Sequence, residues 1–455
     1  MQKKKVAGTA AGSHPCLAVA DSFARRSDLR AGTDSRVMTP GSQRSLLGIL
    51  RPSTVNRRGL WIRETKVATA MASGQVEQVA ATLTAKVKGD LGDAAPVLLL
   101  AFASTKQPLS ELMPLLAASF PHSTVLGAST AGEFVESGDA KGSTVLFALS
   151  GDYRIFAGAA TGLRAGCEQA VLDSLEGMPL QVVGYPHRTA ILLLDPLAGC
   201  SEEAALMTAG LMGFDLRLAG GAAGDDLALK CTHVALGGQV LTDAVVIATV
   251  FSKQPLGVGV CHGHQPLSAP LLVTRAEGSI VHEIDGRPAW DVWVERTRQA
   301  TEALGFDPAQ LPAGEVGGFL LRFEAGLSQG EAFKVRAPLF RVGEHSIGFA
   351  CGIPEGTVIR ITESEPHRQI DSAREAARRA REQVGGVPLA GAVVFDCICR
   401  NLILKDQFQT AIAGIHSELG QVPLAGFETY GEIALNVGDL SGFHNTTTVV
   451  LAFPK

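Results

Sequence analysis

The sequence has few aromatic residues and no long apolar run, and each of these absences argues against a class of function. Phe, Trp and Tyr together make up 5% of the 455 residues, which argues against the stacking surfaces that bind single-stranded nucleic acid. The longest apolar runs, such as residues 190–194, have the length of a strand and are too short to cross a bilayer. We therefore expect a protein that does not bind nucleic acid and does not span a membrane.

Cysteine is also sparse, with eight residues and no secretory signal, so we expect no disulfide framework. The segment Cys261–His264 contains metal-ligating residue types but lacks the second pair that a structural zinc site needs. We therefore expect neither a metal nor a cofactor. If the strand predicted from Ala392 runs on, Cys397 and Cys399 face the same side of it. Whether those two thiols are redox active or only packed remains open.

Acidic residues are scarce at the N-terminus, although the formal net charge of the chain is −5. Residues 1–70 hold 13 Lys and Arg against four Asp and Glu. This stretch is rich in Ser and Gly and lacks apolar periodicity, so we expect residues 1–75 to be unfolded. Its composition is that of an organellar transit peptide, which predicts a plastid location, with a mitochondrial one as the alternative. A tail on a cytoplasmic protein, or an extension before a start at Met71, remains open.

What the chain does contain is a repeated glycine loop. Residues 126–133 read Leu-Gly-Ala-Ser-Thr-Ala-Gly-Glu, residues 424–432 read Leu-Ala-Gly-Phe-Glu-Thr-Tyr-Gly-Glu, and residues 218–225 form a weaker third copy. Glycine has no side chain to keep a ligand away from backbone N–H groups. The acidic residue that ends each copy adds a hydrogen-bond acceptor. The repeat therefore predicts a binding pocket.

The elements that flank the two stronger copies also repeat. Before and after the first copy we predict a strand at 96–102, a helix at 109–120 and a strand at 143–149. The second copy has the same order of strand, helix and strand, at 392–395, 408–419 and 446–453. This spacing predicts an α/β fold with two related lobes of mixed β-sheet covered by helices, arising from internal duplication.

The polar residues near the repeats suit an amino-acid-like ligand. Arg400 follows a strand end, where open α/β sheets often bind ligands, and its guanidinium suits a carboxylate. Glu133 and Glu432 offer acceptors for an ammonium group. The residues expected to bind the ligand are Gly127, Ser129, Thr130, Gly132, Glu133, Arg400, Gly426, Thr429, Tyr430, Gly431, Glu432, His444 and Asn445. The alternative for each is structural, because buried charges usually pair with one another.

Six motifs in order resemble the FIST proteins, which pair a FIST N-terminal with a FIST C-terminal domain. The motifs lie at residues 129–133, 220–225, 273–289, 395–400, 427–432 and 443–446. The resemblance implies a FIST N-terminal domain over residues 90–265 and a FIST C-terminal domain over 266–455. It also implies a sensory protein that binds a small ligand, such as an amino acid, and relays the signal to a partner. His264 departs from the pattern, which has a bulky aromatic residue there.

Two other functions remain open. The family includes an F-box protein of ubiquitin ligases, which suggests an adaptor with a ubiquitin-pathway partner, although no F-box is recognised in residues 1–90. An enzyme would need a nucleophile and a base, for which Cys397 or Cys399 with His444 are the candidates. The sequence has no Walker-type loop and no Gly-x-Ser-x-Gly elbow. We therefore assign no catalytic residue.

Overall fold

The computed structural model describes residues 64–455 except 214, 330–331 and 437–441, and the described residues belong to one compact unit. The transit-peptide prediction concerns residues 1–63 almost entirely and lies outside the described residues. Residues 1–75 are expected to be unfolded, but the described end of this segment is folded. It forms strand β1 (Lys66–Ala72), in which Met71 lies opposite Val145 of the neighbouring strand. This strand pairs along its whole length with one neighbour and forms the edge of a sheet.

The chain builds the same α/β module three times, and we call these modules 1, 2 and 3. Module 1 consists of β1, α2 (Val76–Leu91), β2 (Leu98–Ala103), α3 (Leu109–Ser119), β3 (Thr124–Ser129), β4 (Glu133–Val135), β5 (Gly138–Ala140) and β6 (Thr144–Ser150). Module 2 consists of β7 (Arg154–Thr161), α4 (Cys167–Ser174), β8 (His187–Leu194), η1 (Pro196–Ala198), α5 (Ser201–Met212), β9 (Arg217–Ala222), β10 (Val234–Leu236), β11 (Gln239–Leu241) and β12 (Ala244–Ser252).

Module 3 is interrupted by an insert after its first strand. It consists of β13 (Gly257–His262), α8 (Pro366–Gln383), β23 (Leu389–Cys397), α9 (Ile398–Leu404), η3 (Lys405–Gln407), α10 (Phe408–Glu418), β24 (Leu424–Thr429), β25 (Glu432–Leu435), β26 (Phe443–His444) and β27 (Thr447–Pro454). The α/β class with mixed sheets is confirmed. The weak echo at residues 218–225 lies in module 2, which is also complete, so the predicted duplication extends to a third copy.

Each module donates a hairpin to the sheet of another module. The three six-stranded sheets have the orders β1-β6-β2-β3-β10-β11, β7-β12-β8-β9-β25-β26 and β13-β27-β23-β24-β4-β5. In each sheet the third and fourth strands are parallel and the other pairs are antiparallel. The hairpin β4–β5 thus joins module 3, β10–β11 joins module 1, and β25–β26 joins module 2. The modules are interlocked by backbone pairing.

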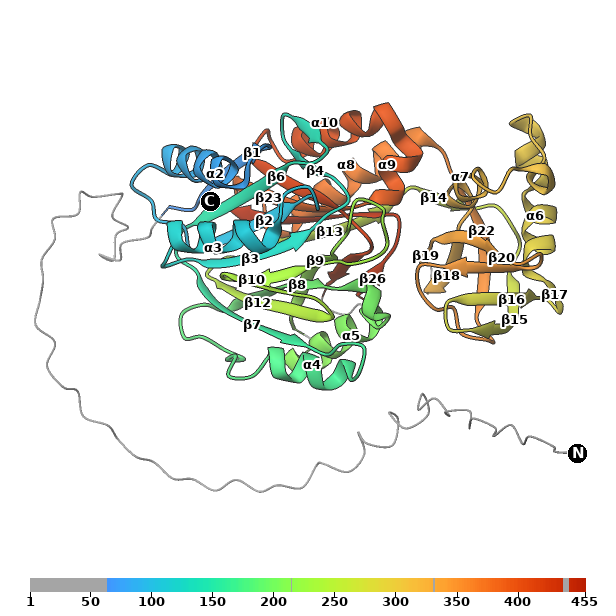
Figure 1. The fold of residues 1–455 in the computed structure, drawn as a ribbon, viewed down its shortest axis with the longest axis horizontal. Helices are drawn as coiled ribbons and strands as arrows, with labels where there is room; N and C mark the ends of the chain where they lie inside the picture. Colours follow the sequence, from blue (N-terminus) through green and yellow to red (C-terminus); the bar gives the residue numbers. More distant parts are fainter. Residues whose placement is uncertain (1–63, 214, 330–331, 437–441) are drawn as a thin grey trace, which may run out of the picture. The chain divides into compact units, whose positions relative to one another are not determined.

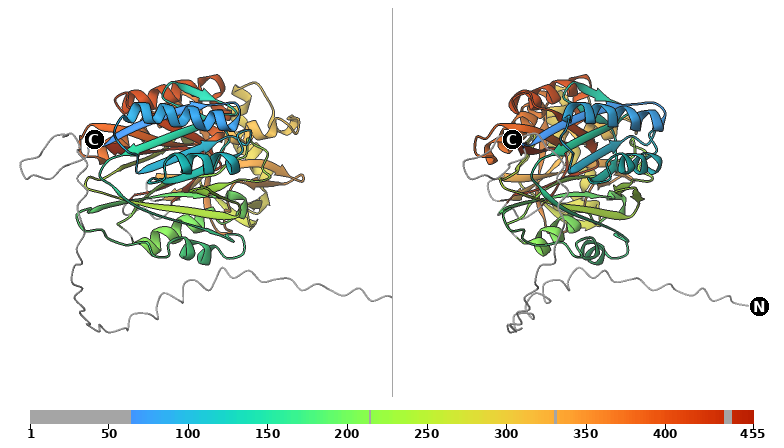
Figure 2. Two further views of the ribbon diagram at one scale, coloured as in Figure 1. Left: turned by 60° about the vertical axis from the view of Figure 1, so that its left-hand side comes forward. Right: turned by 90° about the vertical axis from the view of Figure 1, so that its left-hand side faces the viewer.

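The sheets enclose one shared core, and helices cover their outer faces. The inner faces of all three sheets contribute to the shared core, for example through Phe102, Val246 and Phe395. Helices α2 and α3 pack on the sheet of module 1, α4 and α5 on that of module 2, and α8 and α10 on that of module 3. Figure 1 and the two further views in Figure 2 show these helices outside the sheets. Helix α8 buries a stripe of alanines, which lets it lie close to the sheet.

The insert within module 3 has a core and a sheet of its own. It consists of β14 (His264–Pro266), β15 (Leu271–Glu277), β16 (Ile280–Ile284), β17 (Arg287–Pro288), α6 (Ala289–Ala303), η2 (Pro308–Gln310), α7 (Val316–Arg322), β18 (Ala325–Gln329), β19 (Ala332–Arg336), β20 (Pro338–Val342), β21 (Ser346–Phe349) and β22 (Val358–Ser364). Trp293 is fully buried, and its ring nitrogen donates to Phe323 O at 3.1 Å. The first and last strands of the insert pair with each other, so the chain leaves and re-enters module 3 at one place.

Candidate functional site

The three glycine loops, residues 127–133, 219–226 and 426–432, bond to one another through their backbones. Each loop exchanges two hydrogen bonds with each of the other two. The bonds are Ala131 N to Glu428 O (3.0 Å), Glu428 N to Gly132 O (2.8 Å), Tyr430 N to Ala222 O (3.1 Å), Ala222 N to Gly431 O (2.8 Å), Gly224 N to Ser129 O (2.8 Å) and Asp226 N to Thr130 O (3.0 Å). These amides already have partners within the chain, so the loops hold the three modules together.

The motif glycines are sites of close packing. A Cβ added to Gly132 would lie 2.6 Å from the carboxyl carbon of Glu428, which belongs to another loop. A Cβ on Gly426 would lie 2.4 Å from the ring of Phe134. Real Cβ atoms do not approach neighbours this closely. The repeat therefore keeps glycine where two modules meet, a requirement that sequence alone does not distinguish from a ligand cradle.

The acidic ends of the two stronger loops also have internal partners. Glu133 accepts hydrogen bonds from the Thr130 hydroxyl and from both the backbone and the hydroxyl of Ser143. Glu432 makes the same set with Thr429 and Thr447. Both carboxyls are fully buried. Burial outweighs these hydrogen bonds and raises the pKa of Glu133 to about 7 and that of Glu432 to about 8.

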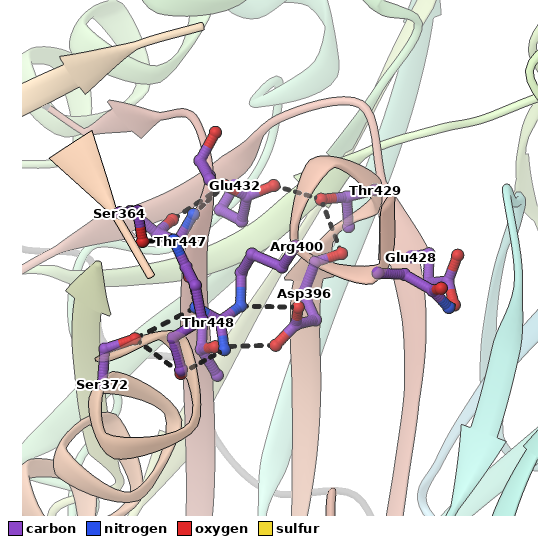
Figure 3. A network of polar contacts seen from close by, with 12 residues as sticks. Ser364, Ser372, Asp396, Arg400, Glu428, Thr429, Glu432, Thr447 and Thr448 are labelled. Carbon is purple, nitrogen blue, oxygen red and sulfur yellow. Dashed lines mark hydrogen bonds and ion pairs between the residues drawn. The ribbon is translucent and has the colours of Figure 1, made fainter. Parts of the chain in front are cut away.

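Arg400 lies inside the protein, where its guanidinium is held by groups of module 3. It donates to Asp396 Oδ1 at 2.8 Å, to Ser372 Oγ at 3.0 Å and to the side chain and backbone of Gln369. Figure 3 shows this network together with Glu432 and its threonine partners. Arg400 and Asp396 have exposed fractions of 0% and 1%. The structure thus gives Arg400 the internal ion pair that was the alternative to carboxylate binding.

A large cavity lies where modules 2 and 3 meet the insert. Its volume is about 860 Å³. It opens at the carboxyl ends of β8 and β23, the edge at which α/β sheets commonly bind ligands. The wall is formed by Pro196, Leu197, Leu227, Leu229, Ser279, Gly317, Gly318, Leu321, Arg322, Ala337, Leu339, Phe340, Phe349, Ala350, Ser364, Pro366, Cys397, Ile398, Cys399, Leu402, Ile403, Lys405, Tyr430 and Asn445. Most of these side chains are apolar.

Tyr430 and Asn445 are the two predicted ligand-binding residues that line this cavity. The Tyr430 hydroxyl donates to Asp225 Oδ1 at 2.6 Å and accepts from Leu227 N at 2.7 Å. The Asn445 amide oxygen accepts from Ala337 N at 3.4 Å, a long bond that leaves the oxygen open to a better donor. The other predicted residues lie in the interlocking loops, in the Arg400 network or, for His444, in strand β26.

Two cations also belong to the cavity wall. Arg322 forms an ion pair with Glu363 through Nε and Nη2. The Lys405 side chain is exposed, and its ammonium has no hydrogen bond or ion pair with any residue that the structure describes. Sequence reasoning missed both. Lys405 has a positive backbone φ of 51° because the chain turns sharply after α9. A lysine does not indicate such a turn in the sequence, as a glycine would.

Cys397 and Cys399 both line the cavity, but not as a pair along a strand. Strand β23 ends at Cys397 and helix α9 begins at Ile398, so Cys399 belongs to the first turn of a helix. The strand alternation expected for the two cysteines is therefore wrong. Their side chains share the cavity because the chain turns between them. Burial and the neighbouring Cys399 thiol raise the pKa of Cys397 well above its usual value.

A buried carboxyl with an unsatisfied oxygen lies next to Cys399. Glu324 accepts from the Thr446 hydroxyl through Oε1 at 2.8 Å, while Oε2 has no hydrogen-bond partner among the described residues. Its Oε1 lies 3.7 Å from His264 Nε2. Burial lowers the pKa of His264 and, together with the Cys399 sulfur, raises that of Glu324 well above its usual range. Burial therefore disfavours the charged form of both side chains.

The described part of the chain shows no hydrogen bond between His444 and either cysteine, which the cysteine–histidine enzyme hypothesis would require. His444 Nε2 lies 3.0 Å from Ala434 O, and no hydrogen bond joins this ring to Cys397 or Cys399. Burial lowers the pKa of His444 to about 3. Among the same residues, no group of three or more His, Cys, Asp or Glu is placed to hold a metal ion. None of the described helices is both long and apolar enough to cross a membrane.

Comparison with known proteins identifies the family. The sequence matches the FIST N domain over residues 97–287 and the FIST C domain over residues 291–435. It is 26% identical over 171 residues to an uncharacterized protein of Methanocaldococcus jannaschii, covering 36% of this chain and 32% of that protein. It is 28% identical over 220 residues to one of Mycobacterium tuberculosis, covering 47% of this chain and 55% of that protein. The chain thus spans about half the length, or less, of these relatives. The two domain matches together cover most of the sequence, and the chain belongs to the FIST family.

Proposed function

We propose that this protein is a sensor whose cavity binds a small amino-acid-like ligand with a large apolar side chain. FIST domains are associated with sensory, small-ligand-binding signalling. The observation that carries the proposal is the apolar cavity of about 860 Å³ with a free cation, Lys405, in its wall. A predominantly apolar cavity with a few convergent polar groups is the usual form of a small-molecule site.

The wall offers a partner for each part of such a ligand. The Lys405 ammonium, and the Arg322 guanidinium beyond its bonds to Glu363, suit a carboxylate. The Asn445 amide oxygen is an acceptor for the ligand ammonium. Leu321, Leu339 and the ring of Phe340 provide apolar contact for the side chain. Glu133, Glu432, Arg400 and the loop glycines would then support the site indirectly, through the interlocked modules.

The position of the cavity supports a route from binding to signalling. The insert contributes Leu339 and Phe340 to the wall, while module 3 contributes Ile403 and Tyr430. A ligand that contacts both favours one arrangement of the insert on the modules over others. The proposed relay is recognition of that arrangement by a signalling partner.

Thermal unfolding of the full chain with a ligand series tests the proposal. Phenylalanine, leucine and tryptophan are compared with phenethylamine, which lacks the carboxylate, and with 3-phenylpropionate, which lacks the ammonium. We expect a saturable rise in Tm with an apolar amino acid and a smaller rise with either analogue. A rise that is equal for 3-phenylpropionate would exclude recognition of the ammonium. No rise with any member of the series would refute the amino-acid-like ligand.

A charge variant locates the site. Lys405→Gln should weaken binding of the amino acid by about tenfold, since a charge-assisted hydrogen bond contributes about 1.5–3 kcal/mol. Lys106→Gln is the matched control, because Lys106 is also exposed but lies outside the cavity wall. Isothermal titration calorimetry gives both affinities. Equal affinities in the two variants would remove Lys405 from the site.

A further inference from the structure

Cys397 and Cys399 place two thiols on one wall of the cavity. Both belong to a small apolar cluster in which residues of module 3 pack against Leu321 and Ala337 of the insert. Their exposed fractions are 2% and 7%, and both are free thiols. A reagent reaches them through the cavity, which they line. Of the other described cysteines, Cys167 is buried and Cys231 is exposed, and the remaining three are partly buried.

The two sulfurs are close enough to interact. The pKa of Cys397 is raised by burial and by the neighbouring thiol of Cys399. Two residues separated by one other span at most about 7 Å when fully extended. The usual limit for bridged Cα atoms is about 6.8 Å. Because the chain turns from β23 into α9 between them, the Cα separation is shorter than the extended limit and approaches the range that a disulfide spans.

We propose that Cys397 and Cys399 form an oxidisable dithiol that reacts with apolar organic hydroperoxides entering the cavity. The apolar wall selects the organic part of such a molecule, and the thiols supply two electrons. The inference depends on the cavity but not on the amino-acid-like ligand. It assigns a modification site to a pair of residues that the FIST domain matches leave without a role.

The reaction balances in two steps. In the first, the Cys399 sulfur bonds to the terminal oxygen of the hydroperoxide, and the O–O bond breaks. The alkoxide that leaves takes the proton of the thiol and becomes an alcohol, while Cys399 becomes a sulfenic acid. In the second, the Cys397 sulfur bonds to the Cys399 sulfur, and the sulfenic oxygen leaves as water with the Cys397 proton. Two thiols are oxidised to one disulfide, and the hydroperoxide is reduced to an alcohol and water.

The surroundings favour attack by Cys399. Cys397 is the more deeply buried of the two, and burial raises the pKa of its thiol well above the usual value, so it suits the second step. The carboxyl of Glu324 lies near Cys399, and its Oε2 has no partner among the described residues. A buried carboxyl with a free oxygen is able to pass a proton from the thiol to the leaving alkoxide. We assign Glu324 this supporting position.

Peptide mass spectrometry tests the proposal on the full chain. The tryptic peptide 382–400 contains both cysteines and no other. After one equivalent of cumene hydroperoxide and alkylation of the remaining thiols, we expect this peptide to be lighter by two hydrogen atoms and unalkylated. Its oxidation should precede that of the exposed Cys231. If Cys231 is oxidised while the 382–400 peptide stays reduced, the proposal is refuted.

Variants separate the two steps. Cys397→Ser should leave a sulfenic acid on Cys399 that dimedone traps, whereas Cys399→Ser should give neither disulfide nor adduct. Trapping only in Cys399→Ser would reverse the assigned roles and overturn the order of attack. Glu324→Gln should slow oxidation at least tenfold and change its pH profile, while the thiols still bind an arsenical. An unchanged rate and profile would remove Glu324 from the proposal.

Phenylarsine oxide gives a second measurement that needs no oxidation. Arsenic forms bonds to two adjacent thiols and releases its oxygen as water. Cys167 and Cys200 are a second pair of neighbouring thiols, so the measurement uses the Cys167→Ser, Cys200→Ser background. We expect one equivalent to bind and Cys399→Ser to abolish binding. Equal binding in Cys399→Ser would show that the pair does not act together. Failure of the amino-acid series with success here would refute the proposed ligand and leave the dithiol standing.

Discussion

Tyr430 combines a packing role with a place in the cavity wall. Its hydroxyl joins module 3 to Asp225 and to the backbone of Leu227 in module 2. Burial raises the pKa of Tyr430 above its usual value, and the adjacent Asp225 carboxylate adds to the rise. Burial alone would raise the pKa of Asp225, but the hydrogen bonds from Tyr430 and from three backbone amides lower it. This residue therefore connects the site with the junction between modules.

Removing the Tyr430 hydroxyl tests how much this connection contributes to stability. Tyr430→Phe leaves the ring in place and removes the partner of Asp225 and Leu227 N, so we expect it to lower the free energy of unfolding by about 1–3 kcal/mol. Tyr153→Phe is the matched control, because within the described residues the Tyr153 hydroxyl has one hydrogen bond, to Thr65 Oγ1 at 3.2 Å. Urea denaturation measures both. A loss no larger in Tyr430→Phe than in the control would contradict this role.

Glu432 makes stability depend on pH. Its folded pKa of about 8 lies above the unfolded value near 4.5, so the neutral form is favoured in the folded state. The stabilising contribution is complete below pH 4.5 and is lost as the pH rises through 8. The same sign holds for Glu133, with its window ending near 7. The buried histidines have lowered pKa values and contribute in the opposite direction, so a difference between variants is more informative than one curve.

The comparison is between the wild type and Glu432→Gln at several pH values. Gln cannot ionise, so the stability of the wild type relative to this variant should fall by up to roughly 1.4 kcal/mol per pH unit between pH 5 and 8. Denaturant titrations at pH 5, 6, 7 and 8 measure it. The exposed Glu77 provides the control, since Glu77→Gln should show no such trend. A constant difference for Glu432→Gln would show that its carboxyl does not titrate in this range.

Among elements, the exchanged hairpins explain why the glycine motif is retained. Hairpin β4–β5 lies on the edge of the module 3 sheet, where Phe134 packs under Gly426. The corresponding Gly127 lies under Met113 of helix α3. Gly426 therefore faces a rigid ring and a carbonyl of the neighbouring strand, whereas Gly127 faces the end of a flexible side chain. The two copies of one motif differ in how much they resist a larger residue.

Alanine substitution should reveal this difference. A Cβ at position 426 would meet the Phe134 ring at 2.4 Å and Val394 O at 2.6 Å, neither of which can move away freely. We expect Gly426→Ala to cost about 2–3 kcal/mol, near the upper end for overpacking. Gly127→Ala should cost less, since the Met113 thioether at 2.7 Å can change rotamer. Thermal denaturation of both variants is the measurement, and a larger loss in Gly127→Ala would contradict the argument.

Much of the module could be predicted from sequence, because its periodic elements are local. The strand at 96–102, the helix at 109–120 and the strand at 446–453 correspond to β2, α3 and β27. In the sequence, module 2 gives only a weak echo of the glycine motif, since Ala219 takes the place of the first glycine. Its closing strand is also held differently: Asp243 N bonds to Asp195, which follows a strand, and not to the acidic end of the loop. The hairpin exchange pairs strands of about three residues between distant modules, which local periodicity cannot reveal.

At the scale of the molecule, the cavity exists because separate parts of the chain meet. Leu227 of module 2, Leu339 of the insert and Ile403 of module 3 are ordinary apolar residues in the sequence. Nothing in their local patterns distinguishes a cavity wall from a core. Tyr430 and Asn445 were predictable because they adjoin a motif, whereas Lys405 and Arg322 adjoin none. Only part of the candidate site could therefore be predicted from the sequence.

The insert also contacts the modules through buried charges. Lys334 and Arg336 of β19 bond to Glu202 in the first turn of α5, at 2.5 and 2.7 Å. The exposed fractions of these two cations are 4% and 1%. Thr446 in module 3 donates to Glu324 of the insert. These bonds hold the insert over the cavity, so the modules should fold without it while the cavity should not survive its removal.

Excision of the insert tests this division. Pro266 and Thr362 lie opposite each other in the antiparallel pair of β14 and β22, so an Asn-Gly turn can replace residues 267–361 with little strain. We expect a folded protein with a cooperative transition, because the three interlocked sheets and their shared core remain. The Tm should fall, since Glu202 and Thr446 lose partners. The rise in Tm with an apolar amino acid should vanish, and Cys399 should become rapidly alkylated. Circular dichroism, calorimetry and timed alkylation follow these changes. A shortened chain that does not fold would show that the insert is part of the folding unit, and one that still binds the ligand would place the site elsewhere.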